Sequence, residues 1–367
     1  MKIEKKINHF KKPLYLESGR ILEPYDIAYT TYGEMNSDKS NIVVITHALT
    51  GSHRPVKEDS EKFSNGWWDD LIGDGKPIDT EKYFVIATNV IGSIFGSTSP
   101  ISKMPPSNSK EYRLNFPVIT IKDMVKAQHI LFQSLGIHKV KAIVGGSMGG
   151  MQALQFGVDF PKFAENIVPI ATTWATQPWA IAFNKITAEA IKRDPLFKGG
   201  DYDREEIEER GLNGLSIGRM AGHISFLSPD SMSDKFGRQY LKNDGYFDLF
   251  GKFQVDNYLE YNGDKFSKNF DPLSYIYLTK AINIFDLSNN CGSLDEVLQQ
   301  IEAKLYLLSF SGDLLFKPHE MREIADSMIR IGKEDSVYYR EIESDYGHDA
   351  FLVEIDKFEN DIREILP

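Results

Sequence analysis

The sequence is poor in cysteine, since Cys291 is the only one among 367 residues. A single thiol excludes an intramolecular disulfide and a metal cluster of several thiolates. Cys291 lies in the segment SNNCGSLDE without a neighbouring base that would activate it, so a structural cysteine is favoured over a nucleophile. A reducing compartment such as the cytoplasm fits this composition.

Long hydrophobic runs are also missing. The apolar stretches have the length of strands, as at residues 42–45, whereas a membrane-spanning helix needs about 20 apolar residues. The N-terminal segment MKIEKKINHFKKPLYLESGR is basic but lacks the apolar core of a secretory signal. We therefore expect a cytoplasmic protein that has no membrane partner.

Basic residues are outnumbered, because 42 Lys and Arg face 53 Asp and Glu and the formal net charge is -11. Nucleic-acid affinity rests on clustered Lys and Arg side chains that release counterions from the phosphates. In this chain the charges are interspersed, which is typical of a solubilising surface. The partners that we expect are small molecules and not nucleic acids.

Short β-rich runs recur along the chain and favour an α/β fold with a mostly parallel central sheet. The runs are rich in Val and Ile, do not alternate with polar residues and are separated by helical stretches, which indicates strands buried on both faces. The apolar spacing over residues 121–135 predicts a helix that Gly136 ends. We expect helices on both faces of a sheet whose strands lie within residues 41–51, 83–92, 140–150, 166–174 and 304–313.

The pattern changes between about residues 174 and 290, where strands disappear and helical, aromatic segments take over. The sheet pattern resumes at Lys304, so the helical part interrupts one domain rather than following it. We expect a core domain of residues 1–173 and 301–367 and an inserted helical lid of residues 174–300. The helical segments expected in the lid are AIAFNKITAEAIKRD, GLSIGRMAGHISFL, DGYFDLFGKFQVDNYLEYN and DPLSYIYLTKAINIF.

The most informative stretch is KVKAIVGGSMGGMQALQF, in which an apolar strand enters the turn GGSMG and a helix leaves it. A GxSxG turn between strand and helix is the nucleophile elbow of the α/β-hydrolase fold. The crowded backbone needs small residues two positions before and after Ser147, and Gly145 and Gly149 supply them. The start of the helix aims amides at a developing negative charge, which makes the Met148 amide a candidate oxyanion donor.

Two other interpretations of this turn compete with the elbow. A phosphate-binding loop is the nearest competitor, but no Lys-Ser or Lys-Thr pair follows the glycines. A Gly-rich packing turn is the second competitor. The apolar strand before Ser147 and the helix after it favour the elbow.

A serine nucleophile needs a general base that a third group holds in place. The chain order of this fold is serine, acid and then histidine, which leaves His223, His319 and His348 among the eight histidines. His223 lies in the predicted lid and His319 at a predicted helix start, whereas His348 lies in the strand-to-loop-to-helix segment REIESDYGHDAFL. We expect His348 as the base and Asp313, which ends the run KLYLLSFSGD, as the acid. The alternative for Asp313 is a simple turn or helix cap.

The second oxyanion donor should come from the loop after an earlier strand. The segment NIVVITHALTG fits this position, and the backbone amide of Leu49 is the candidate. His47 in the same loop could suggest a metal, but no further ligands occur at a recognisable spacing. We therefore expect His47 to be structural and predict no metal site.

Beyond these motifs, a series of distinctive segments follows along the chain, in the order LESGRILEPYDIAYTTYGE, THALTGS, GWWDDLIGDGKPIDTEKYFVI, NVIGSIFGSTSP, FPVITIKDMVKAQ, GGSMGGMQAL, GRMAGHISFLS, FDPLSYIYLTKAI and ESDYGHDAFL. On these segments the chain resembles the homoserine O-acetyltransferase family. The resemblance implies transfer of an acetyl group from acetyl-CoA, as cosubstrate, to L-homoserine in methionine biosynthesis, by a ping-pong route through an acyl-serine. It further implies a homodimer with helical lids, no permanently bound cofactor, and a catalytic triad at Ser147, Asp313 and His348.

The resemblance also implies two substrate contacts, with Arg219 on the homoserine carboxylate and Asp349 on the amino group. A planar guanidinium and a carboxylate suit the two ends of a zwitterion. Without the resemblance, a lid salt bridge and a helix cap would be the simpler roles. Phe226 stands where the family usually has tyrosine, and the arginine expected near Ala175 is missing. Both departures concern substrate selectivity more than the chemistry.

Other activities are compatible with the same residues. A succinyl-CoA donor or a serine acceptor would be a variant within the family, and an esterase with this triad would be a hydrolase. A non-catalytic binding protein is disfavoured, because nucleophile, acid, base and elbow glycines are all present in order.

Overall fold

An eight-stranded sheet forms the centre of the computed structural model, which describes residues 1–58, 63–241, 246–289 and 291–367. The strand order is β1-β4-β8-β5-β9-β10-β11-β12. β4 is antiparallel to both of its neighbours, and every pair from β8 to β12 is parallel, as expected for a mostly parallel sheet. The strands are β1 (Ile3–Phe10), β4 (Tyr25–Tyr32), β5 (Ile42–Thr46), β8 (Phe84–Thr88), β9 (Val140–Gly146), β10 (Ala164–Ile170), β11 (Lys304–Phe310) and β12 (Val337–Ile342).

Two short ladders lie outside this sheet. One joins β2 (Leu14–Tyr15) to β3 (Ile21–Leu22), and the other joins β6 (Ile72–Gly73) to β7 (Ile78–Asp79). β11 begins at Lys304, which confirms the predicted return of the sheet pattern after the helical segment.

The central strands are buried on both faces, and the alternation in β5 shows how. Ile42 and Val44 belong to one apolar cluster, whereas Val43 and Ile45 belong to a second one. Helices α1 (Ile121–Ser134), α2 (Met148–Asp159) and α10 (Pro318–Arg330) contribute to the first cluster. Helices α11 (Ala350–Val353) and α12 (Glu359–Ile365) contribute to the second. The prediction of helices on both faces is therefore confirmed.

Helix α1 agrees with the helix predicted over residues 121–135. Thr120 caps its start. The Thr120 side chain accepts a hydrogen bond from the Asp123 amide, and the Asp123 carboxylate accepts one from the Thr120 amide. Gly136 follows the end of α1 with φ 69°, a backbone conformation that glycine adopts at little cost. The predicted stop is thus confirmed at this glycine.

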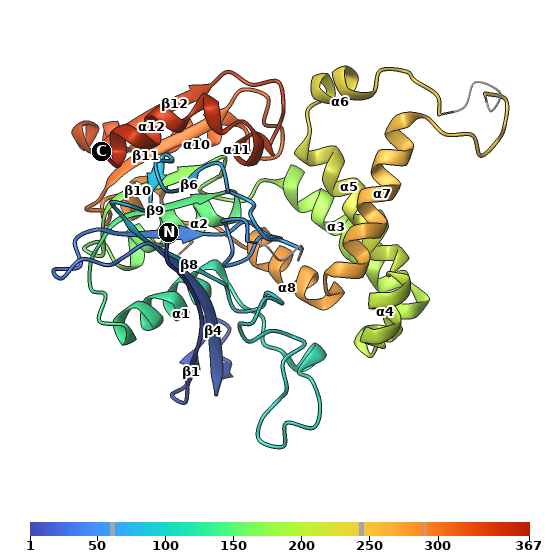
Figure 1. The fold of residues 1–367 in the computed structure, drawn as a ribbon, viewed down its shortest axis with the longest axis horizontal. Coiled ribbons are helices and arrows are strands. Elements are labelled where there is room, and N and C mark those ends of the chain that lie inside the picture. Colours follow the sequence, from blue (N-terminus) through green and yellow to red (C-terminus); the bar gives the residue numbers. More distant parts are fainter. Residues whose placement is uncertain (59–62, 242–245, 290) are drawn as a thin grey trace.

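A group of helices is inserted between β10 and β11, and most of it stands to one side of the sheet (Figure 1). α5 packs against both α3 and α7, and α9 packs against α10 of the core. Leu215 of α5 and Leu278 of α8 join the first apolar cluster, so the insertion and the core share continuous packing. The inserted helices are α3 (Pro178–Arg193), α4 (Arg204–Arg210), α5 (Asn213–Phe226), α6 (Pro229–Phe236), α7 (Gln254–Asn269), α8 (Pro272–Asn283) and α9 (Leu294–Leu298).

One helical prediction within the insertion is wrong. Residues 246–253 are not helical, and α7 begins only at Gln254. The side chains of Phe247, Leu249 and Phe250 are 96%, 87% and 82% exposed, so this segment has no buried apolar face that would stabilise a helix. Residues 242–245 and 290 of the predicted lid lie outside the described residues.

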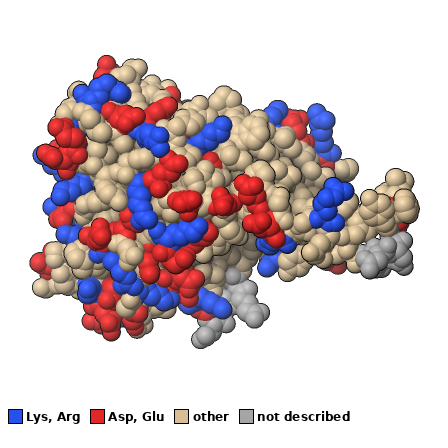
Figure 2. Space-filling model, turned by 90° about the horizontal axis from the view of Figure 1, so that it is seen from above, with Lys and Arg blue, Asp and Glu red and all other residues tan. Residues whose placement is uncertain are grey.

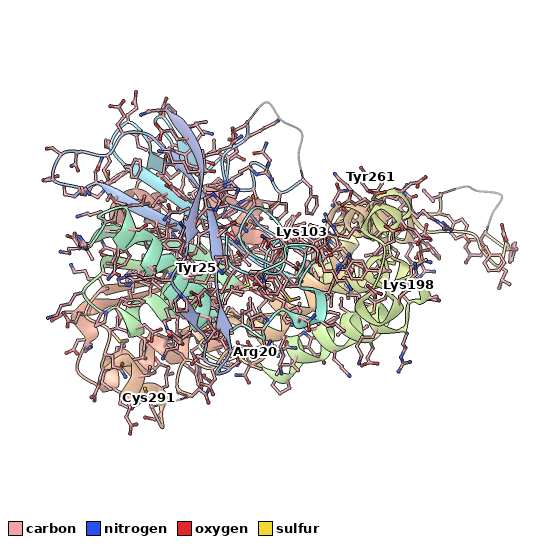
Figure 3. The ribbon with its side chains drawn as sticks, turned by 90° about the horizontal axis from the view of Figure 1, so that it is seen from below. Arg20, Tyr25, Lys103, Lys198, Tyr261 and Cys291 are labelled. Carbon is pink, nitrogen blue, oxygen red and sulfur yellow. The ribbon has the colours of Figure 1, made fainter. Side chains whose placement is uncertain are left out.

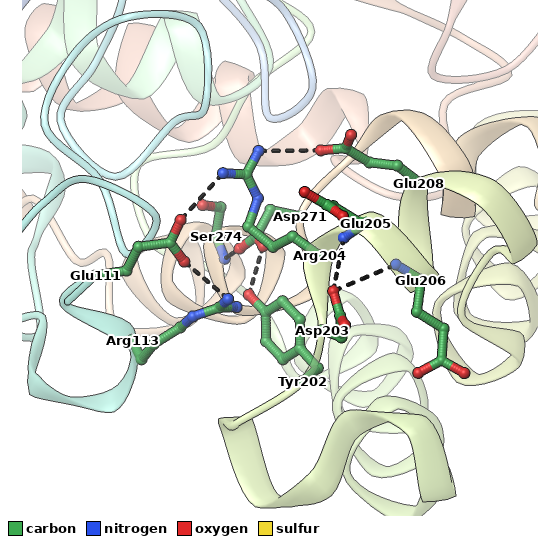
Figure 4. Close-up of polar contacts among 10 residues, drawn as sticks. All are labelled: Glu111, Arg113, Tyr202, Asp203, Arg204, Glu205, Glu206, Glu208, Asp271 and Ser274. Atoms are coloured by element: carbon green, nitrogen blue, oxygen red, sulfur yellow. Dashed lines mark hydrogen bonds and ion pairs between the residues drawn. The ribbon is translucent and has the colours of Figure 1, made fainter. Parts of the chain in front are cut away.

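A cluster of charged and aromatic side chains joins the insertion to the core (Figure 4). Arg204 of α4 pairs with Glu111 of the core at 3.1 Å, and Glu111 also pairs with Arg113 at 2.8 Å. The guanidinium of Arg113 lies 4.0 Å from the ring centre of Tyr202. The Tyr202 hydroxyl donates a hydrogen bond to Asp271, whose carboxylate caps the start of α8. These contacts fix α4 and α8 against one loop of the core.

The surface carries charges of both signs. On the face that Figure 2 shows, acidic and basic side chains are interspersed over the core rather than gathered by sign. Within the described ranges, the structure contains no helix that combines the length and the apolar composition of a membrane span.

Candidate active site

Ser147 lies on the turn between β9 and α2 with φ 57° and ψ -123°. Such a backbone conformation is rare for a residue with a side chain and persists only where the surroundings enforce it. A β-carbon on Gly145 would lie 2.1 Å from Thr46 Oγ1, and one on Gly149 would lie 2.1 Å from the Thr46 carbonyl oxygen. Glycine is therefore required on both sides of Ser147, because the end of β5 packs directly against the turn.

The structure brings the three predicted triad side chains together. The Asp313 carboxylate can only accept, so it accepts the Nδ1 proton of His348 at 2.7 Å, and His348 Nε2 then accepts the Ser147 hydroxyl proton at 2.8 Å. All three residues are buried, with exposures of 8% for Ser147, 1% for Asp313 and 3% for His348. The arrangement can move a proton from the serine hydroxyl to the imidazole.

The carboxylate of Asp313 is held on its other side as well. Its Oδ1 accepts hydrogen bonds from the backbone amides of Leu315 and Phe316, both at 2.9 Å. The other two downstream histidines lie elsewhere: His223 contacts the Tyr258 hydroxyl at 3.3 Å within the insertion, and His319 lies on α10. Neither of these rings lies within hydrogen-bonding distance of Ser147.

The charges around the imidazole decide its pKa. Burial alone would lower the pKa of His348, but the charge of Asp313 and its hydrogen bond, aided by the charge of Asp349, outweigh burial and raise that pKa above its ordinary value. Burial raises the pKa of Asp349, although the nearby charges of His348 and Arg219 oppose this effect. The pocket therefore favours an imidazole that readily accepts a proton.

The two candidate oxyanion amides come from two different segments next to Ser147. Met148 is the first residue of α2, and Leu49 lies in the loop after β5 and lines the same cavity as Ser147. Neither the Leu49 nor the Met148 amide donates a hydrogen bond to any residue that the structure describes. Both groups are thus free to bind an oxygen of a substrate.

His47 is held by the backbone on both ring nitrogens. Its Nε2 accepts a hydrogen bond from the Val90 amide at 3.1 Å, so Nδ1 carries the proton and donates to the Ala48 carbonyl at 2.7 Å. Burial lowers the pKa of His47 to about 4, which keeps the ring neutral. Within the described ranges, no group of three or more His, Cys, Asp or Glu side chains is placed to hold a metal ion.

A cavity opens above Ser147 and is lined by both the core and the insertion. The core contributes the loop after β5, the elbow and the segment around His348, whereas the insertion contributes one face of α3, one face of α5 and part of α8. The lining residues of the insertion are Ala180, Phe183, Asn184, Thr187, Arg219, Gly222, Ser225, Phe226, Tyr275 and Ile282.

Residues 41–355 match the family model described as the alpha/beta hydrolase fold. A homoserine O-acetyltransferase of Sulfurimonas autotrophica is 61% identical over 358 residues, which cover 98% of this chain and 97% of the relative. A homoserine O-acetyltransferase of Nautilia profundicola is 60% identical and is matched over 100% of this chain and 99% of the relative. The chain belongs to the homoserine O-acetyltransferase family.

Solved structures agree with this membership and also show how widely the family's fold is shared. A homoserine O-acetyltransferase from Bacillus anthracis has a TM-score of 0.90 and 28% identity, with 99% of this chain and 97% of that chain covered. Esterase E22 has a TM-score of 0.89 and 26% identity, with both chains covered completely. The fold alone therefore does not separate acyl transfer from ester hydrolysis.

In this member of the homoserine O-acetyltransferase family, Arg219 and Asp349 both face the cavity. The guanidinium of Arg219 lies 4.7 Å from the ring centre of Phe266 and 5.2 Å from that of Phe226. It forms no ion pair with a carboxylate in the described ranges, and the Asp349 carboxylate, which the charges of His348 and Arg219 influence, accepts no hydrogen bond there. The cavity thus contains one cation and one anion that do not neutralise each other by direct contact.

The two departures from the family pattern lie in different places. Phe226 lines the cavity, and its ring centre lies 6.2 Å from that of His348. Ala175 lies outside the cavity lining and pairs with Asp286 in an isolated bridge. Phe226 is therefore part of the cavity wall, whereas Ala175 is not.

Cys291 lies between α8 and α9 of the insertion and packs against the first apolar cluster, well away from Tyr261 of α7 (Figure 3). Its sulfur accepts a hydrogen bond from the Gln300 side chain at 3.2 Å. It is not among the residues that line the cavity around Ser147.

Sequence reasoning missed several cavity residues on α3 and α8. Ala180, Phe183, Asn184 and Thr187 have the spacing of one helix face, and this periodicity could have grouped them. Nothing in the sequence indicates that this face, rather than another one, lies over the serine. Tyr275 of α8 offers no such signal at all.

Proposed function

We propose that the protein transfers the acetyl group of acetyl-CoA to the side-chain hydroxyl of L-homoserine, which yields O-acetyl-L-homoserine and CoA for methionine biosynthesis. The observation that carries this proposal is the hydrogen-bonded chain from Ser147 through His348 to Asp313, below a cavity with an unpaired Arg219 and an unpaired Asp349. Family membership supplies the substrates.

In the first half of the proposed cycle, the enzyme becomes acylated. His348 Nε2 takes the hydroxyl proton of Ser147 while Oγ attacks the thioester carbonyl carbon, and the amides of Leu49 and Met148 bind the resulting oxyanion. The C–S bond then breaks, and the imidazolium returns the proton to the CoA sulfur. Asp313 stabilises the imidazolium and keeps the ring oriented.

In the second half, homoserine replaces CoA in the cavity. The same imidazole takes the proton of the homoserine hydroxyl, whose oxygen attacks the acyl carbon, and the bond to Ser147 Oγ breaks as the proton returns to this oxygen. A ping-pong sequence follows, because CoA leaves before homoserine reacts.

We propose that Arg219 and Asp349 position the acceptor. A guanidinium binds a carboxylate through two parallel hydrogen bonds, and a carboxylate binds an ammonium group. Two opposite charges that stay apart within one cavity suit an α-amino acid zwitterion, which presents both charges at a fixed separation. Acetyl-CoA carries no such zwitterion at its reacting end.

The core of residues 1–173 and 301–367 would then supply the chemistry, and the insertion of residues 174–300 would act as a lid. Several cavity walls come from α3, α5 and α8, so the acyl group on Ser147 is enclosed on the side away from the sheet. Enclosure limits access of water to the acyl-enzyme and favours attack by the aligned alcohol.

The acyl-enzyme is the direct test. After mixing with acetyl-CoA and rapid acid quenching, the tryptic peptide that contains Ser147 is expected to gain the mass of one acetyl group, and Ser147→Ala is expected to gain none. Parallel mixing with succinyl-CoA identifies the donor. An acetylated peptide in Ser147→Ala at the wild-type level would rule out this serine as the nucleophile.

We further propose a cytoplasmic homodimer without a permanently bound cofactor. The exposed side chains of Phe247, Leu249 and Phe250 form the kind of apolar surface that a protein interface covers. Light scattering coupled to size-exclusion chromatography should give twice the chain mass of 41.7 kDa. A mass of one chain across the micromolar range would contradict the dimer.

A further inference from the structure

Behind the elbow lies a chain of buried polar side chains that the proposed cycle does not use. Thr88, Gln128 and Gln152 are each at most 1% exposed and come from β8, α1 and α2. Thr88 Oγ1 donates to Gln128 Oε1 at 2.7 Å, and Gln128 Nε2 donates to Gln152 Oε1 at 2.8 Å. Buried polar groups require such partners, so removal of one side chain would leave the next one without its hydrogen bond.

The direction of these hydrogen bonds fixes the amide of Gln152. Because Oε1 of Gln152 faces the Gln128 amide, its Nε2 points the other way and donates to two backbone carbonyls, those of His47 and Met148, both at 3.1 Å. The opposite amide orientation would place an oxygen against two carbonyl oxygens. The two backbone carbonyls, which can only accept, therefore fix the orientation of the Gln152 amide, and Gln128 donates to its other end.

The two carbonyls belong to the two segments that carry the proposed oxyanion donors. Met148 is itself one donor residue, and His47 lies two residues before Leu49 in the loop after β5. The peptide that bears the Leu49 N–H also bears the Ala48 carbonyl, which accepts from His47 Nδ1 at 2.7 Å and from the Gly51 amide at 2.9 Å. Gln152 binds the carbonyl of the preceding peptide, between His47 and Ala48, and so links this loop to the start of α2.

We propose that Gln152 is a positioning residue that sets the spacing between the Leu49 and Met148 amides. This inference rests on the proposed function, since it assigns those amides to the oxyanion of acyl transfer. Oxyanion stabilisation depends on donors already held at the correct distance before the charge develops. Thr46 Oγ1 also joins the segments, through the Gly149 carbonyl at 2.8 Å, but Thr46 lies in the strand, whereas Gln152 holds the loop itself.

Replacement of the Gln152 amide tests the proposal. Gln152→Met keeps the side-chain length but donates to neither carbonyl, and Gln152→Glu keeps the shape but presents a carboxylate. Loss of a complete oxyanion donor costs about 10²–10³ in rate, so a displaced donor should lower the rate of CoA release in a single turnover by roughly tenfold to a hundredfold. The KM for homoserine should change less than about twofold, because the acceptor contacts are untouched.

A second readout separates positioning from mere folding. A small alkylboronic acid forms a tetrahedral adduct with a serine Oγ and places a hydroxyl in the oxyanion site, so its affinity should fall by about the same factor as the acylation rate. Ser327→Ala is the matched control, since Ser327 is fully buried on α10 and donates a hydrogen bond to Asp295, far in the chain from the elbow. It should lower the unfolding temperature without changing either readout.

The outcomes distinguish this inference from the proposed function. Folded Gln152→Met with unchanged acylation rate and unchanged boronic acid affinity would overturn the positioning role. If one Gln152 variant does not fold, Gln128→Met removes the donor to Gln152 Oε1, weakens the hold on this side chain and should give a smaller loss in both readouts. A wild-type enzyme that forms no acyl-enzyme would contradict the proposed function, while boronic acid affinity would still decide the role of Gln152.

Discussion

The three triad side chains are those of Ser147, Asp313 and His348, and each is held by a different local constraint. The serine is set by a rare backbone conformation that neighbouring glycines permit, and the aspartate is set by two backbone amides. The histidine lies between them and receives its orientation from both. At the scale of single residues, proton transfer therefore depends on charges that surround one imidazole.

The raised pKa of His348 predicts the acid limb of the acylation rate. Only the neutral imidazole accepts the Ser147 proton, so the rate should rise with pH and reach half its maximum above pH 6.5, the ordinary imidazole pKa. Asp349→Asn removes one of the negative charges that raise this pKa, and the midpoint should move to lower pH. The burst rate of CoA release, measured from pH 5 to 9 without homoserine, reports this shift.

Asp345→Asn is the control for that titration, since Asp345 is exposed and is not among the charges that act on His348. Its acid limb should coincide with that of the wild type. An equal displacement in both variants would show that any lost surface charge moves the midpoint, which would contradict a specific effect of Asp349.

Arg219 gives a second prediction at the residue scale. Arg219→Lys keeps the positive charge but cannot form two parallel hydrogen bonds to a carboxylate. Loss of a hydrogen bond to a charged group costs about 1.5–3 kcal/mol, so the KM for homoserine should rise by roughly tenfold to a hundredfold. The burst with acetyl-CoA alone should stay unchanged, because the donor does not use this contact.

The matched control is Arg238→Lys. Arg238 also belongs to the insertion and lies 5.7 Å from the ring centre of Phe253, but it does not line the cavity. Its steady-state constants should equal those of the wild type. A wild-type KM in Arg219→Lys would remove Arg219 from the acceptor site.

At the scale of elements, the insertion depends on a few buried contacts with the core. Tyr202 is 3% exposed and donates its hydroxyl hydrogen to Asp271, which is 7% exposed and caps α8. Burial without a partner is costly for a carboxylate, so this one hydrogen bond supports both the entry into α4 and the start of α8.

Tyr202→Phe should therefore destabilise the fold. The variant leaves a buried oxygen of Asp271 without its donor, which costs about 1–3 kcal/mol of unfolding free energy. Urea denaturation followed by circular dichroism measures the loss. Tyr261→Phe is the control, because Tyr261 is 63% exposed on α7 (Figure 3) and its hydroxyl should contribute nothing measurable. Equal stabilities for the two variants would contradict an anchoring role for Tyr202.

Strands with continuous apolar character were predictable, as were α1 and the elbow, because each carries a local signal of periodicity or of required glycine. β1 and β4 were not predicted. IEKKINHF is an edge strand whose charged residues resemble a solvated terminus, and YDIAYTTY mixes polar Asp and Thr residues into a strand that the sheet buries. The helix expected at residues 246–253 failed because aromatic composition alone does not bury a face. The local sequence indicates whether a segment favours a helix or a strand. Whether the segment forms that structure depends on the surface against which it can pack.

At the scale of the whole molecule, only the part of the site that a known motif identifies could be predicted from the sequence. The elbow and the chain order pointed to Ser147, Asp313 and His348, which the structure brings within hydrogen-bonding distance. The contact between Gln128 and Gln152 could not be foreseen, because it joins two helices that each read as ordinary packing helices. No pattern in the sequence shows that polar side chains on two different helices lie close together in the fold.

The choice between transfer and hydrolysis also belongs to the scale of the whole molecule. The same fold occurs in esterase E22, so the fold alone does not decide it. Both classes can form an acyl-serine, and they differ in whether water or a bound alcohol removes the acyl group. In this chain the cavity around Ser147 is lined by α3, α5 and α8 of the insertion as well as by the core. We therefore expect the insertion to keep water from the acyl carbon until an aligned acceptor arrives.

This expectation is measurable as the ratio of two rates. With acetyl-CoA alone, CoA release should show one burst per active site and then proceed slowly, whereas saturating homoserine should raise the steady rate by about a hundredfold or more, which corresponds to about 2.7 kcal/mol in barrier. Glycerol at the same concentration controls for a generic alcohol and should have little effect, because it lacks the charges that Arg219 and Asp349 would bind. Equal CoA release with and without homoserine would make the protein a hydrolase, despite its family.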